Sequence, residues 1–230
     1  MRAKVVTAFV PLNVKHLSAD TYHEYGKQLE AACGDRFRFF DNFPLDDCWL
    51  TKENPPLMPA SETPSDRYET REDHARSNIV QHSRTQWALK ALAEELCPPD
   101  FIVWLDLAVM KQGAWLGNQI THGHVVDFLE NVEKLPSGII PFPGIEERKP
   151  VDPSGNNWRF CGSTHIWPVS YLPEIDRSYK FYTREFIRRY KTIPLDLAVW
   201  PTVEERSGLP FRWYKAEYDA TQLTNLRSVL

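Results

Sequence analysis

The 230-residue sequence has few cysteines and no long apolar run. Its four cysteines form no Cys-x-x-Cys pair, so the usual zinc spacing is absent, and a disulfide framework is not expected in a chain of this length. No stretch approaches the roughly 20 apolar residues that a membrane-spanning helix needs. The first 13 residues lack the small-residue cleavage site of a signal peptide. We therefore expect a cytoplasmic protein without a membrane span.

The motifs of several large enzyme classes are also missing. The sequence contains no GxxxxGKS/T, GxGxxG, GxSxG or HExxH pattern, which excludes the usual kinases, dehydrogenases, serine hydrolases and zinc proteases. A formal net charge of -4 argues against nucleic-acid binding by the whole surface. A local basic cluster lies within residues 184–191, for which a solvated helix face is the plainer explanation.

Apolar runs alternate with amphipathic segments, most regularly in the first half of the chain. We expect strands over residues 4–10, 36–43, 101–110, 138–145 and 211–218, an edge strand within 156–172, and helices over 18–33, 72–97, 122–135, 174–191 and 195–206. On the 72–97 helix, Leu96 is expected on the apolar side and His74 and His82 at the surface. The stretch 49–70, dense in Pro, Glu, Ser and Thr, predicts a long irregular loop. This order favours one three-layer α/β domain with a mixed sheet over residues 1–230.

Asp106 is the first candidate site residue, because it is a single acid within an otherwise apolar strand. Burying an unpaired carboxylate costs several kcal/mol, so this acid should lie at the carboxyl end of the strand. In open α/β sheets that end is where ligands bind. A carboxylate there can hold a divalent cation that also binds a diphosphate. A turn cap or an arginine partner for Asp106 is the alternative.

Two stretches resemble the HtrL/YibB and WlaTC glycosyltransferase-like family. In residues 82–112, as in that family, a helix with a basic residue (Arg84 or Lys90) leads to an apolar strand. This strand ends in Trp104-Leu105-Asp106, similar to the family's Trp–Ile–Asp-like motif. The stretch 195–226 is similar in having an acid near a tryptophan, an aromatic strand, an acidic turn and a Leu-Thr-Asn tail. The resemblance implies a GT-A fold, a nucleotide-sugar donor and transfer of the sugar to an acceptor.

The resemblance also implies how the donor would be held. Asp106 would lie at the metal or the ribose, and Asp219 could complete a site for Mn²⁺ or Mg²⁺. The chain departs here from the Asp-x-Asp pattern of metal-dependent GT-A members, because residues 106–108 read Asp-Leu-Ala. Arg76 and Arg84 could instead neutralise the diphosphate, since guanidinium groups bind phosphate oxygens bidentately. Either arginine could also be an ordinary residue of the helix surface.

Asp196 is the candidate catalytic base. It is a lone acid between apolar neighbours, and in an inverting transferase a carboxylate deprotonates the acceptor hydroxyl. A helix N-cap is the alternative for Asp196, because it follows Pro194 and precedes a predicted helix. Thr7 and the loop after the first strand would contact the nucleotide.

The segment around Cys161–His165 could contact the sugar. Gly162 would allow close backbone approach to a ligand, and Thr164 and His165 can hydrogen-bond a sugar hydroxyl. Trp167 and Trp200 could stack on a sugar or base, although a place in the core is the more common one for tryptophan.

The acceptor stays open among a glycan, a small molecule and a hydroxylated DNA base. A DNA acceptor would need segments 184–191 and 49–70 to form a groove, with an extruded base stacking on a tryptophan. A hypothesis from a different class is a GT-A-like domain that has lost catalysis and binds a nucleotide, a glycan or a protein partner. The lone Asp106 supports this second hypothesis.

Overall fold

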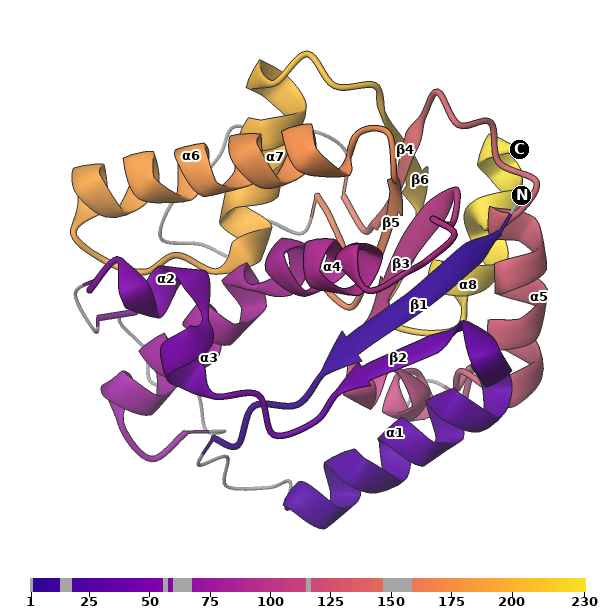
Figure 1. Ribbon diagram of the computed structural model, residues 1–230, viewed down its shortest axis with the longest axis horizontal. Coiled ribbons are helices and arrows are strands. Elements are labelled where there is room, and N and C mark those ends of the chain that lie inside the picture. The colour runs from indigo at the N-terminus through magenta and orange to yellow at the C-terminus, as the bar shows by residue number, and fades with distance from the viewer. Residues whose placement is uncertain (1, 13–17, 56–57, 60–67, 115–116, 147–158) are drawn as a thin grey trace.

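One of the two inner strands of the main sheet is the apolar segment that precedes Asp106 in the sequence. The computed structural model describes residues 2–12, 18–55, 58–59, 68–114, 117–146 and 159–230 (Figure 1). The described strands are β1 (Ala3–Ala8), β2 (Phe37–Phe40), β3 (Phe101–Leu105), β4 (Ile140–Gly144), β5 (Thr164–Pro168) and β6 (Phe211–Lys215). The described α-helices are α1 (Ala19–Cys33), α2 (Trp49–Lys52), α3 (Arg71–His82), α4 (Arg84–Ala93), α5 (His122–Val132), α6 (Leu172–Tyr190), α7 (Asp196–Arg206) and α8 (Thr221–Thr224).

The main sheet has the strand order β2-β1-β3-β5. Strand β1 runs parallel to both β2 and β3, whereas β5 is antiparallel to β3. Val103 in β3 therefore pairs with Val5 of β1 on one side and with Ile166 of β5 on the other. Strands β4 and β6 form a separate parallel pair. All five residues of β3 are buried, as expected for a strand with neighbours on both edges and helices on both faces.

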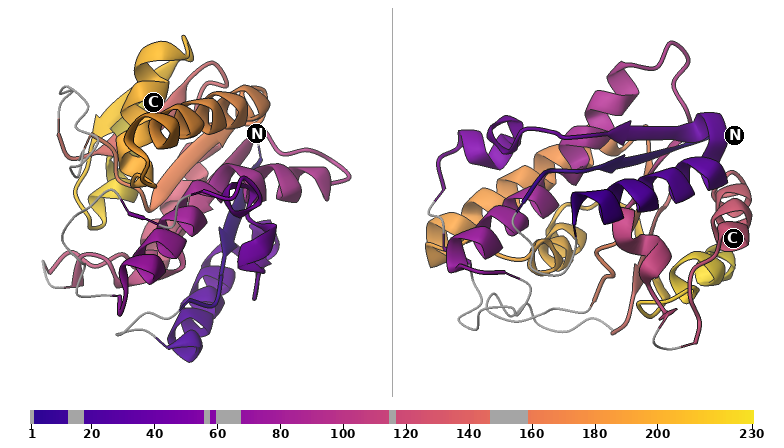
Figure 2. Two further views of the ribbon diagram at one scale, coloured as in Figure 1. Left: turned by 90° about the vertical axis from the view of Figure 1, so that its left-hand side faces the viewer. Right: turned by 90° about the horizontal axis from the view of Figure 1, so that it is seen from below.

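Two hydrophobic clusters lie on opposite faces of this sheet. One packs α1, α5 and α8 against it, and the other packs α3, α4, α6 and α7. The left panel of Figure 2 shows the strands between α1 on one side and α6 and α7 on the other. The prediction of a three-layer α/β architecture with a mixed sheet is therefore confirmed. None of the described helices is long and apolar enough to span a bilayer.

The predicted helix over 72–97 is wrong as a single element, because Ser83 divides it into α3 and α4. The Ser83 hydroxyl donates to the Ile79 carbonyl at 3.0 Å, and its backbone, at φ -93° and ψ 1°, leaves the helical region. A side-chain bond of this kind competes with the helical ladder. Helix α4 also ends at Ala93, so Leu96, expected on the apolar side, is fully exposed. The break places Arg84 in the first turn of α4.

The strand expected over 101–110 ends at Leu105. Asp106 is still extended, but its carbonyl then accepts from Val109 at 2.8 Å, which starts the 3-10 helix η3 (Leu107–Lys111). Asp106 therefore lies at the carboxyl end of β3, as predicted. The expected loop over 49–70 contains α2 and a bridge from Pro59 to Ile193, and its residues 56–57 and 60–67 lie outside the described part of the chain.

Candidate active site

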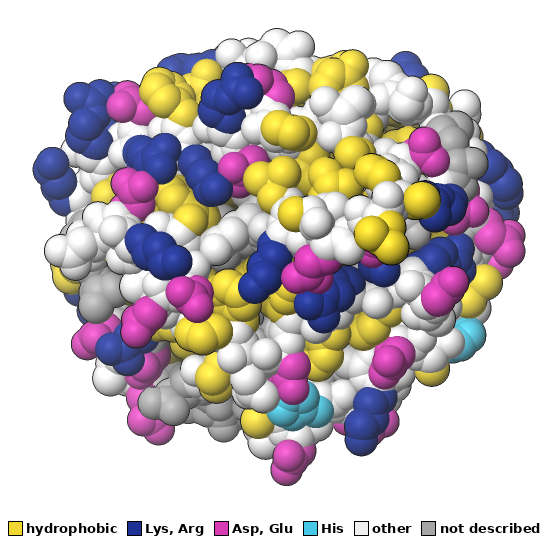
Figure 3. All heavy atoms as spheres, viewed as in Figure 1, with side chains coloured by type: hydrophobic (Ala, Val, Ile, Leu, Met, Phe, Trp, Pro, Cys, Tyr) yellow, Lys and Arg dark blue, Asp and Glu magenta, His cyan; other side chains and the backbone are white. Residues whose placement is uncertain are grey.

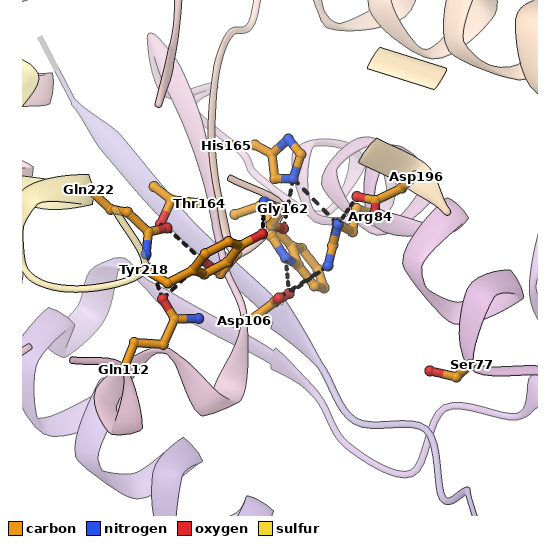
Figure 4. Close-up of polar contacts among 12 residues, drawn as sticks. Ser77, Arg84, Asp106, Gln112, Gly162, Thr164, His165, Asp196, Tyr218 and Gln222 are labelled. Carbon is orange, nitrogen blue, oxygen red and sulfur yellow. Dashed lines mark hydrogen bonds and ion pairs between the residues drawn. The ribbon is translucent and has the colours of Figure 1, made fainter. Parts of the chain in front are cut away.

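Arg84 lies between two carboxylates that come from distant parts of the chain (Figure 4). Its Nη2 donates to both carboxylate oxygens of Asp106, at 3.1 and 3.0 Å. Its Nη1 donates to Oδ2 of Asp196, the first residue of α7. The arginine partner that the sequence left open for Asp106 is thus present. Helix α4, the end of β3 and the start of α7 together form one charged cluster.

The two carboxylates of this cluster differ in how far a ligand can reach them. The side chain of Asp196 is 2% exposed, whereas that of Asp106 is 30% exposed. Trp104 Nε1 also donates to Oδ1 of Asp106, at 2.6 Å. That oxygen accepts two hydrogen bonds, while Oδ2 accepts one and keeps a lone pair. Asp106 is therefore the accessible carboxylate, and Asp196 supports Arg84 from behind.

Burial and charge set the protonation of the cluster. Burial raises the pKa of the Asp196 carboxyl to about 6, and the nearby Arg84 offsets part of this effect. Burial works to lower the pKa of Arg84, but Asp106 and Asp196 outweigh it, so the pKa is raised and the guanidinium stays charged. Above about pH 6 the cluster therefore holds one cation and two anions. Its net charge is negative.

The raised pKa of Asp196 predicts a specific pH dependence of stability. Because the folded state holds this proton more tightly than the unfolded state, the contribution of Asp196 to the free energy of unfolding falls as pH rises from about 4 to about 6. We expect wild type to lose about 2 to 3 kcal/mol relative to Asp196→Asn between pH 4 and pH 7. Urea unfolding at several pH values measures this difference, and a constant difference across the range would contradict the assignment.

His165 is buried next to the cluster and is neutral. Its Nε2 lies 3.0 Å from the Gly162 carbonyl, which can only accept, so Nε2 carries the hydrogen. Burial lowers the pKa of His165 well below its usual value. The ring packs between Phe142, Trp167 and Trp200, at centroid distances of 4.6, 5.1 and 5.2 Å. In this arrangement His165 fixes the Gly162 backbone and does not face a pocket.

Gly162 approaches the charged pair closely. A Cβ at this position would lie 3.4 Å from Oδ2 of Asp196 and 3.5 Å from Nη1 of Arg84. The close approach that the sequence suggested therefore exists, and its partners are protein side chains. Thr164 is fully buried in β5, and its hydroxyl lies 3.4 Å from Oε1 of Gln222.

Three further candidates lie outside the cluster. Thr7 is fully buried, at the second-to-last position of β1. Arg76 is exposed on α3 and pairs with acids of its own helix, at positions i-4 and i-3. Asp219 accepts hydrogen bonds from Thr221 and from Asn118, the latter at 2.9 Å. Thr7 is therefore shielded from any ligand, and Arg76 and Asp219 are both bound to other residues of the protein.

The residues present do not fit a resident divalent metal ion. Asp106 offers one lone pair of one oxygen, and Asp219, the other candidate ligand, already accepts from Thr221 at Oδ1 and from Asn118 at Oδ2. Across the described ranges, no three His, Cys, Asp or Glu side chains come together as metal ligands would.

Burial decides the alternatives left open for two tryptophans and corrects the place expected for two histidines. Trp167 and Trp200 are at most 1% exposed and belong to the core, the more common place for tryptophan, so neither stacks on a ligand. His82 is fully buried, and His74 is 8% exposed. The sequence misplaced both histidines because the buried face of α3 is polar and gives no apolar periodicity. His82 lies 2.7 Å from the Tyr179 hydroxyl and 2.9 Å from the Pro194 carbonyl, so it joins α3 to α6 and to the segment before α7.

The basic segment at the end of α6 is a mixed-charge surface. Figure 3 shows basic side chains with acidic ones among them where Figure 1 has α6. Arg184 pairs at 2.8 Å with Glu53, the residue that follows α2, and Arg188 pairs at 2.8 Å with Glu185. The acids reduce the positive charge available to a polyanion here.

Sequence reasoning missed several residues of this region. Trp104 lies two positions before Asp106, and the alternation of a strand places both side chains on one face, so that signal was available. Tyr218, whose hydroxyl accepts from the Gly162 N–H at 3.3 Å, carries no such signal. The same holds for Gln112 and Gln222, which become neighbours through the fold alone.

Comparisons with known proteins bear on the fold. No protein-family model matches the sequence, and a search of curated proteins finds no significant match. Among solved structures, the chain is similar to a glycosyltransferase involved in the glycosylation of the major capsid of PBCV-1, with a TM-score of 0.52. The two are 13% identical in sequence, and the match covers 94% of this chain and 82% of that chain. The chain therefore has a glycosyltransferase-like α/β fold, while membership of the HtrL/YibB–WlaTC family stays a prediction.

Proposed function

We propose that this protein is a glycosyltransferase that moves a sugar from a nucleotide-sugar donor to a hydroxyl acceptor. The observation that carries the proposal is the accessible carboxylate of Asp106 at the carboxyl end of β3, held by a buried arginine. In α/β sheets this end of the strands is where ligands bind. The similarity of fold to a glycosyltransferase supports the choice of reaction.

In this proposal Asp106 contacts the sugar being transferred. Positive charge develops on the anomeric carbon as its bond to the diphosphate breaks, and a fixed carboxylate nearby stabilises that charge. Arg84 keeps the Asp106 carboxylate in one orientation through two hydrogen bonds. Asp196, the base expected from the sequence, reaches an acceptor only if Arg84 moves, because it is buried behind that side chain. We therefore propose that Asp196 positions Arg84.

The proposal names no residue that binds the diphosphate, and it leaves the class of acceptor open. Both terminal nitrogens of Arg84 already bind carboxylates, so we give it no phosphate contact. A glycan, a small molecule or a hydroxylated DNA base would each supply the hydroxyl. A domain that binds a nucleotide, glycan or protein without catalysis is the second candidate, which the burial of Asp196 favours.

A thermal-shift screen followed by a turnover assay tests the proposal. UDP-, GDP-, dTDP- and CMP-sugars are compared with and without Mn²⁺, and hydrolysis or transfer is then measured for those that raise the unfolding temperature. Turnover by wild type that is lost in Asp106→Ala supports the transferase. Binding without turnover supports the non-catalytic domain, and no response to any of these nucleotide-sugars contradicts the transferase.

A further inference from the structure

The side chains of Gln112, Gln222 and Ser163 form a polar network next to Tyr218, close to the site around Asp106. Figure 4 shows Gln112 and Gln222 on one side of the Tyr218 ring in that view and Arg84 on the other. Gln222 is fully buried, its Oε1 accepts from the Ser163 hydroxyl at 2.6 Å, and its Nε2 donates to Oε1 of Gln112 at 2.5 Å. A buried amide is costly unless it is hydrogen-bonded, so Gln222 is held in one orientation.

In this network the amide nitrogen is the open end of the Gln112 side chain. Its Oε1 accepts from Gln222 and also lies 3.2 Å from the Ser163 hydroxyl. The amide nitrogen Nε2 therefore points away from the network, and within the described part of the chain it has no hydrogen-bond partner. Gln112 itself is half-buried. A satisfied internal network thus ends in one unused donor.

The same residue that orients Gln112 also holds Asp106. The Ser163 carbonyl accepts from the Asp106 N–H at 2.9 Å, while the Ser163 hydroxyl contacts the two glutamines. The five-residue helix η3 connects Asp106 directly to Gln112. The two side chains are therefore fixed relative to each other, one offering an acceptor and the other a donor. A sugar hydroxyl both donates and accepts, so it complements such a pair.

We propose that Gln112 and Asp106 form a subsite for the uncharged sugar of the donor. Gln112 Nε2 donates to one sugar hydroxyl, and Asp106 Oδ2 accepts from another. This inference rests on the proposed function and adds to it the two residues that recognise the sugar.

The charge of the site specifies that the sugar is uncharged. Arg84 supplies one positive charge against the two negative charges of Asp106 and Asp196, and Gln112 adds none. A sugar carboxylate in this subsite would be repelled by the remaining negative charge. A neutral hexose meets no such repulsion.

Isothermal titration of matched ligand pairs tests the subsite. The pairs are UDP with UDP-glucose, GDP with GDP-mannose, and dTDP with dTDP-glucose, and UDP-glucuronate serves as the acidic sugar. Gln112→Ala is expected to weaken the sugar nucleotide by about 3- to 10-fold and to leave the free diphosphate unchanged. Gln112→Glu, which keeps the acceptor and the shape but loses the donor, should weaken it at least as much. UDP-glucuronate should bind wild type more weakly than UDP-glucose.

Gln119→Ala is the matched control, because Gln119 lies in the segment following η3 and its amide donates to the Met110 carbonyl at 2.9 Å. That variant should keep wild-type affinity for both members of each pair. Equal losses for sugar nucleotide and free diphosphate in Gln112→Ala, or no loss, would overturn the subsite while leaving the proposed function standing. A wild type that binds neither member of any pair would instead contradict the proposed function itself.

Discussion

Replacing Arg84 with methionine is expected to lower the free energy of unfolding by about 3 to 5 kcal/mol at pH 8, because it leaves a buried carboxylate without its charge partner. Asp196 is 2% exposed and would lose its guanidinium donor. Asp106, at 30% exposed, can recover hydrogen bonds from water and contributes less to the loss. Urea unfolding of the two proteins measures the difference.

The pH dependence separates this electrostatic loss from lost packing. Arg84 lowers the pKa of Asp196, so without it that pKa rises above about 6 and the buried carboxyl protonates more readily. The penalty of Arg84→Met should therefore be smaller at pH 5 than at pH 8. Adding Asp196→Asn should recover part of the loss at pH 8. Arg76→Met is the control, since the partners of this arginine among the described residues are acids of α3, and its loss should stay below about 1 kcal/mol. A penalty for Arg84→Met that does not vary with pH would contradict the charge cluster.

The position of Asp106 could be predicted from the sequence because the signal is local. Five apolar residues precede Asp106, all five are buried, and the strand ends at the last of them. The sheet architecture follows from the same kind of signal, the alternation of apolar runs with amphipathic helices. The secondary structure around a residue, and the place of that residue within its strand or helix, can thus be predicted from its neighbours in sequence.

The geometry of the cluster could not be predicted in the same way. Arg84 and Asp196 are 112 positions apart, and their contact depends on how α4 and α7 pack on one face of the sheet. The sequence singled out both residues as candidates, but it could not show that they bind each other. It therefore gave Arg84 to the diphosphate and Asp196 to the acceptor, whereas in the structure each occupies the other.

The break at Ser83 had a similar consequence. A serine within an amphipathic segment does not by itself end a helix, and the hydroxyl bond to Ile79 is visible only in the structure. Because α4 starts at the residue after Ser83, the Arg84 side chain projects from the first turn of this helix toward the end of β3. The interruption that sequence reasoning missed is thus what positions the central cation of the site.

Asp106→Asn is expected to lower kcat for sugar transfer by about 100- to 1,000-fold, the effect of removing one preorganised electrostatic group from a transition state. The asparagine keeps the size of the side chain and an oxygen that accepts from Trp104 and Arg84, so the fold should be retained. It loses the negative charge that faces the anomeric carbon. KM reflects only the lost hydrogen bond from a sugar hydroxyl to Oδ2, whereas the charge matters most when positive charge develops on the sugar, so KM should change less than kcat.

The matched control for this variant is Asp219→Asn. If both aspartates held a catalytic metal, as the resemblance allows, the two variants would lose activity together and excess Mn²⁺ would restore part of it. The contacts of Asp219 with Thr221 and Asn118 instead give it a local structural role, so Asp219→Asn should keep most of the rate. Initial rates with and without Mn²⁺ distinguish these outcomes. An Asp106→Asn enzyme whose kcat stays within tenfold of the wild-type value would show that Asp106 is not part of the reaction centre. Its neighbours Trp104 and Arg84 are both hydrogen-bond donors, so neither could replace the lost negative charge.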